Sequence, residues 1–187
     1  EGAGGKQARN GMKHKVVVTG GAGFIGSHLA ERLVNEGYEV HVIDNLVTGT
    51  PENVRLDAIF HHGDILDFDS IKNVFGGALY VFHTAALARV QPSIQDPRAS
   101  NNANVAGTLN VLLAARDAGV KRVVYSASSS AYGNPEQMPM QEHMEARPMS
   151  PYALQKYVGE LYARLFSFLY SVETVSLRYF NVYGPRM

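Results

Sequence analysis

Residues 16–26 decide the fold, and they read VVVTGGAGFIG. The three consecutive valines predict a short strand that is buried on both of its faces. The glycines that follow match G-x-G-x-x-G at Gly21, Gly23 and Gly26, and they match G-x-x-G-x-x-G when Gly20 is taken as the first. Glycines permit a tight turn and let a phosphate group approach the backbone, while the next helix begins with free N–H groups. The stretch therefore predicts a strand, a phosphate-binding turn and a helix in succession.

Outward from this turn, apolar segments of strand length alternate with helical patterns. A helix is expected over residues 24–36, because Ile25, Leu29 and Leu33 lie one turn apart and Gly37 follows as a stop signal. Strands are expected at 16–18, 40–43, 58–61, 79–82, 122–125 and 174–177, and further helices at 70–75, 99–118 and 151–170. This alternation predicts an α/β fold, a doubly wound parallel sheet of about six strands with helices on both faces.

Composition limits the class of protein. The 187 residues correspond to about one domain, and a hydrophobic content of 45% is enough to bury a core. The 17 basic and 17 acidic side chains cancel, which argues against a nucleic acid or an anionic membrane bound by bulk charge. The absence of cysteine excludes disulfides, thiolate catalysis and Cys-ligated zinc. No apolar run reaches the roughly 18 residues that span a bilayer, and no export signal is recognisable, so we expect a soluble cytoplasmic protein.

Acidic and small residues follow the expected strands at their carboxyl ends. Asp44 ends the second strand, where a carboxylate can accept both ribose hydroxyls of an adenosine and would repel a 2′-phosphate. No arginine stands beside it, so NAD is favoured over NADP, although Asp44 could also serve only as a loop cap. Asp64 and Ile65 end the third strand and could contact adenine, while Ala85 and Ala86 end the fourth and leave room for a cofactor. The seven histidines show no metal-binding spacing, and no metal is expected.

Tyr152 and Lys156 are candidates for acid–base chemistry. They lie four residues apart in a helix that Ser150 and Pro151 open in the favoured way, so they share a face. A phenol has an unperturbed pKa of about 10. A neighbouring ammonium and the positive nicotinamide ring of a bound cofactor are both expected to lower the pKa of Tyr152 toward the working pH. A hydroxyl donor for the same oxygen is available among the serines that follow the fifth strand, which are Ser126, Ser128, Ser129 and Ser130. A tyrosine and a lysine at this spacing are more often a packed ring beside a solvated charge, so the prediction depends on the order of all these motifs.

Several stretches, from about residue 15 to residue 187, match one family in the same order. They are VTGGAGFIGSHLAERL (18–33), VIDNLVTG (42–49), GDI (63–65), HTAA (83–86), NVAGTLNVLLAA (104–115), VVYSASSSAYG (123–133), SPYALQKYVGE (150–160) and LRYFNVYGPR (177–186). With them the chain resembles the extended short-chain dehydrogenase/reductase family, in its branch of NAD-dependent nucleotide-sugar epimerases and dehydratases. The resemblance implies a Rossmann-type fold and NAD as the cofactor.

The resemblance also implies a role for individual residues. The diphosphate of NAD would contact Gly20, Gly23, Phe24, Ile25 and Gly26, and the adenosine would contact Asp44, Asn45, Thr48, Gly49, Asp64 and Ile65. The rest of the cofactor would be bound by Ala85, Ala86, Asn104, Tyr152, Lys156 and Phe180. The catalytic residues would be Ser128, Tyr152 and Lys156, and the substrate would contact Ser128, Ser129 and Asn181.

Two serines decide which reaction of the family is expected. Dehydratases that resemble this chain have an Asp-Glu pair directly after the catalytic threonine, and decarboxylases have a Glu at the second of those positions. Here the positions are Ser129 and Ser130, which cannot act as general acids near neutral pH. The reaction that needs no extra group is epimerisation of a UDP-sugar at C4 through a transient 4-keto intermediate, with UDP-glucose and UDP-galactose or the N-acetylated pair as substrates. The alternatives are an NAD-binding fragment without turnover, or another nucleotide-sugar oxidoreductase or dehydratase of the family.

The domain organisation is inferred from where the resemblance begins and stops. Residues 1–12 show almost no apolar periodicity and are expected to be a flexible tail or an expression remnant, with Met12 as the natural start. Residues 13–187 would form the NAD-binding domain, and the C-terminal substrate lobe of the family would be absent. The expected helices 99–118 and 151–170 resemble the pair that joins two subunits in a four-helix bundle, which implies a homodimer. The candidates for an exposed apolar face are Leu161, Leu165 and Phe168, although this stripe could equally be ordinary core.

Overall fold

The protein, described from a computed structural model, contains one parallel sheet, and the structure describes residues 13–135 and 137–187. The six strands lie in the order β3-β2-β1-β4-β5-β6, and every neighbouring pair is parallel. Their bounds are β1(Lys15–Thr19), β2(Glu39–Asp44), β3(Ile59–His62), β4(Ala78–His83), β5(Arg122–Ser128) and β6(Glu173–Tyr179). The predicted fold class is therefore confirmed. The expectation for residues 1–12 concerns a segment outside the described residues.

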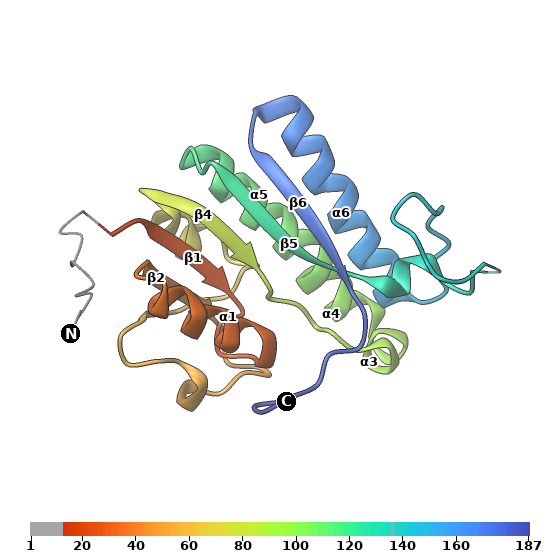
Figure 1. Cartoon of the computed structure of the whole chain (residues 1–187), viewed down its shortest axis with the longest axis horizontal. Helices are drawn as coiled ribbons and strands as arrows, with labels where there is room; N and C mark the ends of the chain where they lie inside the picture. Colours follow the sequence, from red (N-terminus) through yellow and green to blue (C-terminus); the bar gives the residue numbers. More distant parts are fainter. Residues whose placement is uncertain (1–12, 136) are drawn as a thin grey trace, which may run out of the picture.

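Helices cover both faces of the sheet, as Figure 1 shows with α1(Phe24–Asn35) on one side and α5(Gly107–Asp117) and α6(Pro151–Tyr170) on the other. The valine run of β1 explains how both layers attach. Val16 and Val18 pack in a cluster with Ala30 and Leu33 of α1. Val17 points the other way, into a larger cluster that contains residues of α5 and Phe166 of α6. Alternate side chains of one strand thus bury apolar surface on both faces, which is what a continuous apolar run predicts.

The long helix expected over 99–118 is longer and less regular than predicted. It begins as α4(Pro97–Asn101), because the Asp96 carboxylate accepts a hydrogen bond from Ala99 N at 2.9 Å and Pro97 occupies the first turn. A π-helical turn, η3(Asn102–Ala106), then precedes α5. Gly107 follows this turn and lies against Ile65, whose Cδ1 would be 2.5 Å from a Cβ at that position. The π turn therefore lies where the helix packs closely on the end of β3.

Several other elements differ in their bounds from the sequence-based expectation. The helix expected at 70–75 consists of α2(Phe68–Ile71) and a tighter 3-10 turn, η2(Lys72–Phe75), before the glycine pair 76–77. A short helix, α3(Val90–Gln95), was not predicted. The remaining 3-10 turns are η1(Pro51–Asn53) and η4(Ser129–Tyr132). Strands β5 and β6 each extend beyond the predicted range, and β5 includes Ser126 and Ser128, which were expected just after it.

The strand order creates a crevice at the edge of the sheet formed by the carboxyl ends of the strands. Neighbours β1 and β4 are followed by connections that run to opposite sides, so their carboxyl ends leave a crevice, which is where doubly wound sheets bind ligands. The glycine turn, Asp44, the 83–86 segment and the serines after β5 all follow strand ends at this edge. Within the described residues, no helix is long and apolar enough to cross a membrane.

Candidate functional site

The glycine turn after β1 is packed so tightly that side chains cannot enter it. Gly20 has a positive φ of 73°, and its N–H donates to Ile43 O at 2.7 Å. A Cβ at Gly20 would lie 2.6 Å from Ala85 N, and one at Gly26 would lie 2.7 Å from Thr84 Oγ1. The turn is therefore held between the ends of β2 and β4, and its shape requires glycine at Gly20 and Gly26.

The start of α1 presents free N–H groups toward the crevice. Its N-cap residue, Gly23, supplies no side-chain hydrogen bond, whereas the N-cap residue of α6, Ser150, accepts one from Ala153 N. A Cβ at Gly23 would approach only Gly20 O, at 3.3 Å, so the space in front of the first turn is otherwise open. Open space before uncapped N–H groups suits a diphosphate, because these groups and the helix dipole attract anions.

The acidic residues Asp44, which ends β2, and Asp64, which follows β3, come together beside this turn. The Asp44 carboxylate accepts hydrogen bonds from Ala22 N at 3.0 Å and from Leu46 N at 2.8 Å, one on each oxygen. Asn45 Nδ2 donates to Asp64 Oδ2 at 3.0 Å. Asp44 therefore does cap the loop, as the alternative interpretation proposed, but each of its oxygens keeps a lone pair for a ribose hydroxyl.

Of three further segments predicted to bind the cofactor, two border the same turn and the third packs against Gly107. Gly49 lies against Ala22, whose carbonyl carbon would be 2.7 Å from a Cβ at Gly49, so the loop with Thr48 packs on the glycine turn. Ala85 touches Gly20 from the end of β4 and is half-buried, as is Ala86. Ile65 is buried against Gly107. The structure thus brings the predicted adenosine and diphosphate residues to one edge of the sheet.

Asn104 lies deeper than a cofactor contact would. It is 1% exposed, its Oδ1 accepts from Leu87 N at 2.9 Å, and its Nδ2 donates to Leu87 O and to Gln155 Oε1. Gln155 Nε2 in turn donates to Ser100 Oγ at 3.0 Å. Asn104 therefore joins the coil segment after β4 to α6, and it can support the site only through Leu87 and Gln155, which it holds.

Ser128 and Tyr152 face the same edge from β5 and α6. Ser128 ends β5, and its Oγ lies 2.8 Å from Ser130 Oγ and accepts a hydrogen bond from Ser130 N at 3.2 Å. Burial raises the pKa of Tyr152 above its usual value, while hydrogen bonding with Ser128 acts in the opposite direction. The prediction that the Lys156 ammonium lowers the pKa of Tyr152 was wrong for this structure, because that ammonium lies over a different tyrosine ring and the half-buried phenol loses solvation.

Lys156 is a buried cation. The residue is 4% exposed, and its Nζ lies 4.7 Å from the centroid of the Tyr125 ring. Burial lowers the pKa of Lys156 to about 7. Among the described residues, no hydrogen bond to its Nζ is present. An ammonium that makes no hydrogen bond with the described residues and lies at this edge of the sheet fits the hydroxyls of a bound nucleotide.

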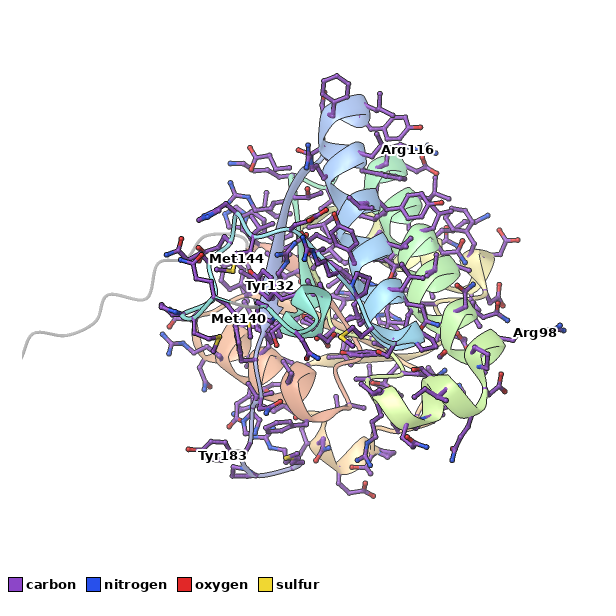
Figure 2. All side chains as sticks on the ribbon, turned by 90° about the vertical axis from the view of Figure 1, so that its right-hand side faces the viewer. Arg98, Arg116, Tyr132, Met140, Met144 and Tyr183 are labelled. Carbon is purple, nitrogen blue, oxygen red and sulfur yellow. The ribbon has the colours of Figure 1, made fainter. Side chains whose placement is uncertain are left out.

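The C-terminal coil borders the crevice on the far side. Tyr179 of β6 is in register with Ser128, so Phe180 and Asn181 leave the sheet beside that serine, and both are exposed. The coil then reaches α1, where His28 Nε2 lies 2.9 Å from Pro185 O and Arg186 pairs with Glu31. Tyr183 of this coil points into solvent (Figure 2). The coil was predicted to flank the substrate, but its contact with α1 was not.

The comparison with known families agrees with this geometry. Residues 16–187 match the sequence profile of the NAD dependent epimerase/dehydratase family. The chain belongs to this family. NAD is the cofactor by which the epimerase/dehydratase family is defined, and the glycine turn and the free start of α1 fit its diphosphate.

The proteins that resemble this chain include several 4-epimerases. A putative UDP-glucose 4-epimerase of Methanocaldococcus jannaschii is 42% identical over 173 residues, which are 91% of this chain and 57% of that protein. The solved UDP-glucose 4-epimerase of Thermotoga maritima with UDP-glucose has a TM-score of 0.90 at 40% identity, covering 92% of this chain and 57% of that one. The UDP-glucose 4-epimerase of Thermus thermophilus, solved as a complex with NAD, has a TM-score of 0.88 at 42% identity, with the same two coverages. The chain therefore spans little more than half the length of these relatives.

Two side chains that hold α6 in this member of the epimerase/dehydratase family were not predicted from the sequence. Ser93 of α3 is fully buried, and its Oγ donates to Val90 O and accepts from Tyr152 N at 3.0 Å. Gln155 is buried next to Lys156 and bonds Asn104 and Ser100. No local pattern identifies either residue, because each acts on a partner more than fifty residues away in the sequence.

The buried Lys156 leads to a prediction about stability and pH. Between pH 7 and about 10 the unfolded chain holds a proton on this lysine that the folded chain has lost, so the stability of the wild type rises with pH in that window. Below pH 7 Lys156 is protonated in the folded protein, and the desolvation of its ammonium lowers the free energy of unfolding by the largest amount. We therefore expect Lys156→Met to raise the free energy of unfolding by about 2 kcal/mol or more at pH 6, and by much less at pH 10. Urea unfolding at both pH values measures this.

The control is Lys121→Met, which replaces an exposed lysine at the start of β5. The difference in the free energy of unfolding between this variant and the wild type should be the same at both pH values. A Lys156→Met variant that is less stable than the wild type at pH 6 would contradict the burial of a charged side chain.

Proposed function

We propose that residues 13–187 form the NAD-binding domain of a nucleotide-sugar 4-epimerase, which interconverts UDP-glucose and UDP-galactose or their N-acetylated forms. The observation that supports this most directly is the shared edge. The uncapped start of α1 follows β1, and Ser128 ends β5, which is separated from β1 only by β4. Tyr152 and Lys156 belong to α6, which packs against β5. An elongated dinucleotide bound across that edge would have its diphosphate at one end and the phenol at the other.

NAD would be bound by residues that the structure places around the glycine turn. Gly23 leaves the backbone open to the diphosphate, and the close packing at Gly20 and Gly26 fixes the shape of the turn. Asp44 keeps lone pairs for the adenosine ribose. A carboxylate at this position disfavours a 2′-phosphate, so NAD is proposed in preference to NADP. When bound, NAD supplies a reversible acceptor for the hydrogen at C4 of the sugar.

The side chains of this chain would manage the proton of the sugar 4-hydroxyl. Ser128 would donate a hydrogen bond to that oxygen, and Tyr152 would remove its proton as the sugar is oxidised and return it when the 4-keto sugar is reduced on its other face. Lys156 would favour the ionised form of the phenol once nucleotide hydroxyls solvate its ammonium. Ser129 and Ser130 offer no acid for loss of water, which favours epimerisation over dehydration.

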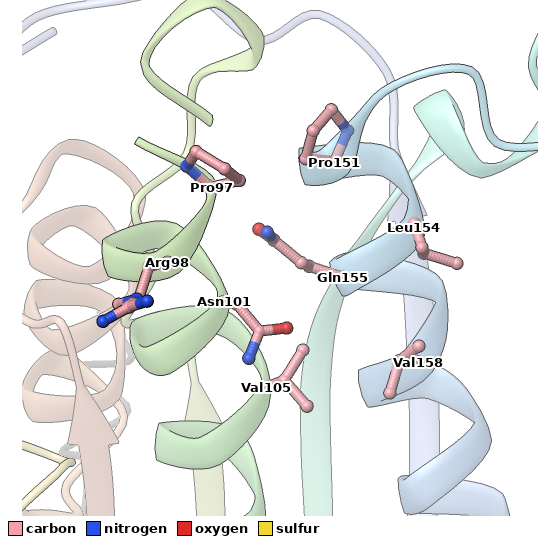
Figure 3. Close-up of a pocket in the computed structure, with 8 residues that line it drawn as sticks. All are labelled: Pro97, Arg98, Asn101, Val105, Pro151, Leu154, Gln155 and Val158. Carbon is pink, nitrogen blue, oxygen red and sulfur yellow. The ribbon is translucent and has the colours of Figure 1, made fainter. Parts of the chain in front are cut away.

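A homodimer is proposed on the basis of the outer face of α6. Leu161, Leu165 and Phe168 are exposed to 44%, 48% and 83%, so the predicted stripe is surface rather than core. Beside it lies a groove of about 440 Å³ between α4, η3 and α6, with Gln155 pointing across toward α4 (Figure 3). Large exposed apolar side chains along one face of α6 favour a second copy as the group that covers them.

The experiment uses the purified chain. Bound nucleotide is released and identified by mass spectrometry, NAD and NADP binding are measured by calorimetry, and the mass in solution is measured by light scattering. UDP-glucose and UDP-N-acetylglucosamine are then incubated with and without added NAD, and NMR follows the configuration at C4. We expect NAD binding, weaker NADP binding, the mass of a dimer, and interconversion of C4 epimers without net use of NAD.

Each other outcome identifies an alternative. Binding of NAD without turnover would favour the NAD-binding fragment, and net reduction of NAD with substrate would favour a sugar dehydrogenase. A chain that binds no NAD contradicts the proposal as a whole.

A further inference from the structure

Tyr125 lies directly beneath the proposed catalytic lysine. It belongs to β5, is 1% exposed, and its hydroxyl donates to the backbone carbonyl of Lys156 at 3.2 Å. Gly159, on the next turn of α6, makes room for the phenol, because a Cβ there would lie 2.6 Å from Tyr125 Cζ. The strand and the helix are therefore closer at this point than a side chain at Gly159 would allow.

The face of the same ring receives the ammonium of Lys156, with Nζ 4.7 Å from the ring centroid. The negative face of an aromatic ring attracts a cation, and the attraction is larger where water is excluded. Tyr125 thus contacts Lys156 at both ends of the residue, through its hydroxyl at the backbone and through its ring at the ammonium.

The other titratable groups near the ammonium are engaged elsewhere or are neutral. The His83 ring of β4 lies beside Tyr125, tilted by 31° with centroids 5.6 Å apart, but its two ring nitrogens contact Thr19 Oγ1 and Thr108 Oγ1. Burial lowers the pKa of His83 to about 3, so the histidine is uncharged. Glu160 of α6 is held by Arg178 through two hydrogen bonds, and Tyr152 lies one turn before Lys156.

From this arrangement we propose that Tyr125 is a positioning residue for Lys156, whose ring face holds the ammonium at the carboxyl edge of the sheet. The hydroxyl of Tyr125 holds the turn of α6 from which the lysine extends. This inference deepens the proposed function, on which the catalytic role of Lys156 rests. The contact itself is a property of the folded chain and can be tested without NAD or substrate.

The first test is the titration of Lys156 in the folded protein without nucleotide. The protein is labelled with ¹³C at lysine Cε, the NMR shift is followed against pH, and Lys156→Met assigns the signal. Tyr125→Leu removes the ring, and we expect the pKa of Lys156 to fall by about one unit. Tyr125→Phe keeps the ring face and should leave this titration unchanged. Tyr125→Met is the second variant if the leucine variant does not fold, because its flexible side chain fills irregular space.

The second test is NAD affinity, measured by calorimetry on the same variants. Loss of the ring should weaken NAD binding about tenfold, because a misplaced ammonium loses its charge-assisted hydrogen bonds to the nucleotide. The matched control is Tyr80→Leu, which removes a half-buried ring from β4 on the opposite face of the sheet, where it packs with the α1 cluster. This control should change neither the Lys156 titration nor the NAD affinity.

The outcomes separate the two proposals. A wild type that binds no NAD contradicts the proposed function, while the lysine titration still decides the role of Tyr125. If folded Tyr125→Leu or Tyr125→Met titrates at Lys156 like the wild type, the positioning role is wrong. A shift of the same size in Tyr80→Leu would also overturn it, since the effect would then be a general loss of packing.

Discussion

Gly26→Ala is expected to remove NAD binding and to destabilise the folded protein by about 2 kcal/mol or more. The added methyl group would lie 2.7 Å from Thr84 Oγ1 and closer still to the carbonyl oxygen of Gly20. The Gly20 carbonyl belongs to the turn, so the clash is relieved only if α1 moves away from the end of β1. That movement displaces the free N–H groups from the diphosphate, and we expect NAD affinity to fall at least about 100-fold. Urea unfolding and calorimetry measure the two effects.

The control for this substitution is Gly76→Ala. Gly76 has a φ of −55°, and a Cβ there would approach nothing closer than Asn73 O at 3.5 Å. This variant should match the wild type in stability to within about 0.5 kcal/mol and bind NAD normally. If Gly26→Ala binds NAD with wild-type affinity, the proposal that the glycine turn and the start of α1 bind the diphosphate is wrong.

Tyr152→Phe is expected to lower the rate of C4 epimerisation about 1,000-fold while leaving NAD affinity close to that of the wild type. The substitution removes the phenol oxygen that would take and return the proton of the sugar hydroxyl, and it keeps the ring that is half-buried at the start of α6. Ser128 remains but cannot replace it, because an unactivated hydroxyl is a poor base near neutral pH. The measurement is the rate of UDP-galactose formation from UDP-glucose under saturating substrate.

Tyr157→Phe makes the same chemical change five residues later on α6 and serves as the control. Tyr157 lines a surface pocket with His143 and Arg164, away from the glycine turn. We expect it to keep the wild-type rate. Undiminished turnover by Tyr152→Phe would rule out its role as the acid–base group.

Local patterns were sufficient to predict most elements of this fold. The helix 151–170 was predicted with the observed bounds, because Ser150 and Pro151 form a start signal that depends only on neighbouring residues. The valine run of β1 and the glycine turn were equally predictable from the sequence. A strand that is buried on both faces requires consecutive apolar residues, and a turn without room for Cβ atoms requires glycine. The gathering of these residues at one edge of the sheet was also predictable, because the carboxyl ends of parallel strands lie at the same edge.

Features that depend on distant partners could not be read in the same way. The π turn at Asn102–Ala106 lies in a segment whose composition is that of an ordinary helix, and it precedes the close packing of Gly107 on Ile65. Helix α3 was missed because it is short and contains a proline, and its serine contacts Tyr152 only in the folded chain. The prediction that the Lys156 ammonium lowers the pKa of Tyr152 was wrong for this structure. Spacing along a helix does not indicate desolvation or the direction in which the Lys156 ammonium points.

The order of residues along the chain was enough to predict a doubly wound sheet, a phosphate-binding turn at Gly20–Gly26 and a tyrosine and lysine on one helical face. These follow from backbone sterics and side-chain periodicity, which act between near neighbours. Tertiary packing alone decided that Lys156 is buried on the ring of Tyr125, that Asp44 holds the glycine turn, and that Ser93 holds the start of α6. Solvation and hydrogen bonding set the charge and the position of these groups, and both depend on segments that meet only when the chain is folded.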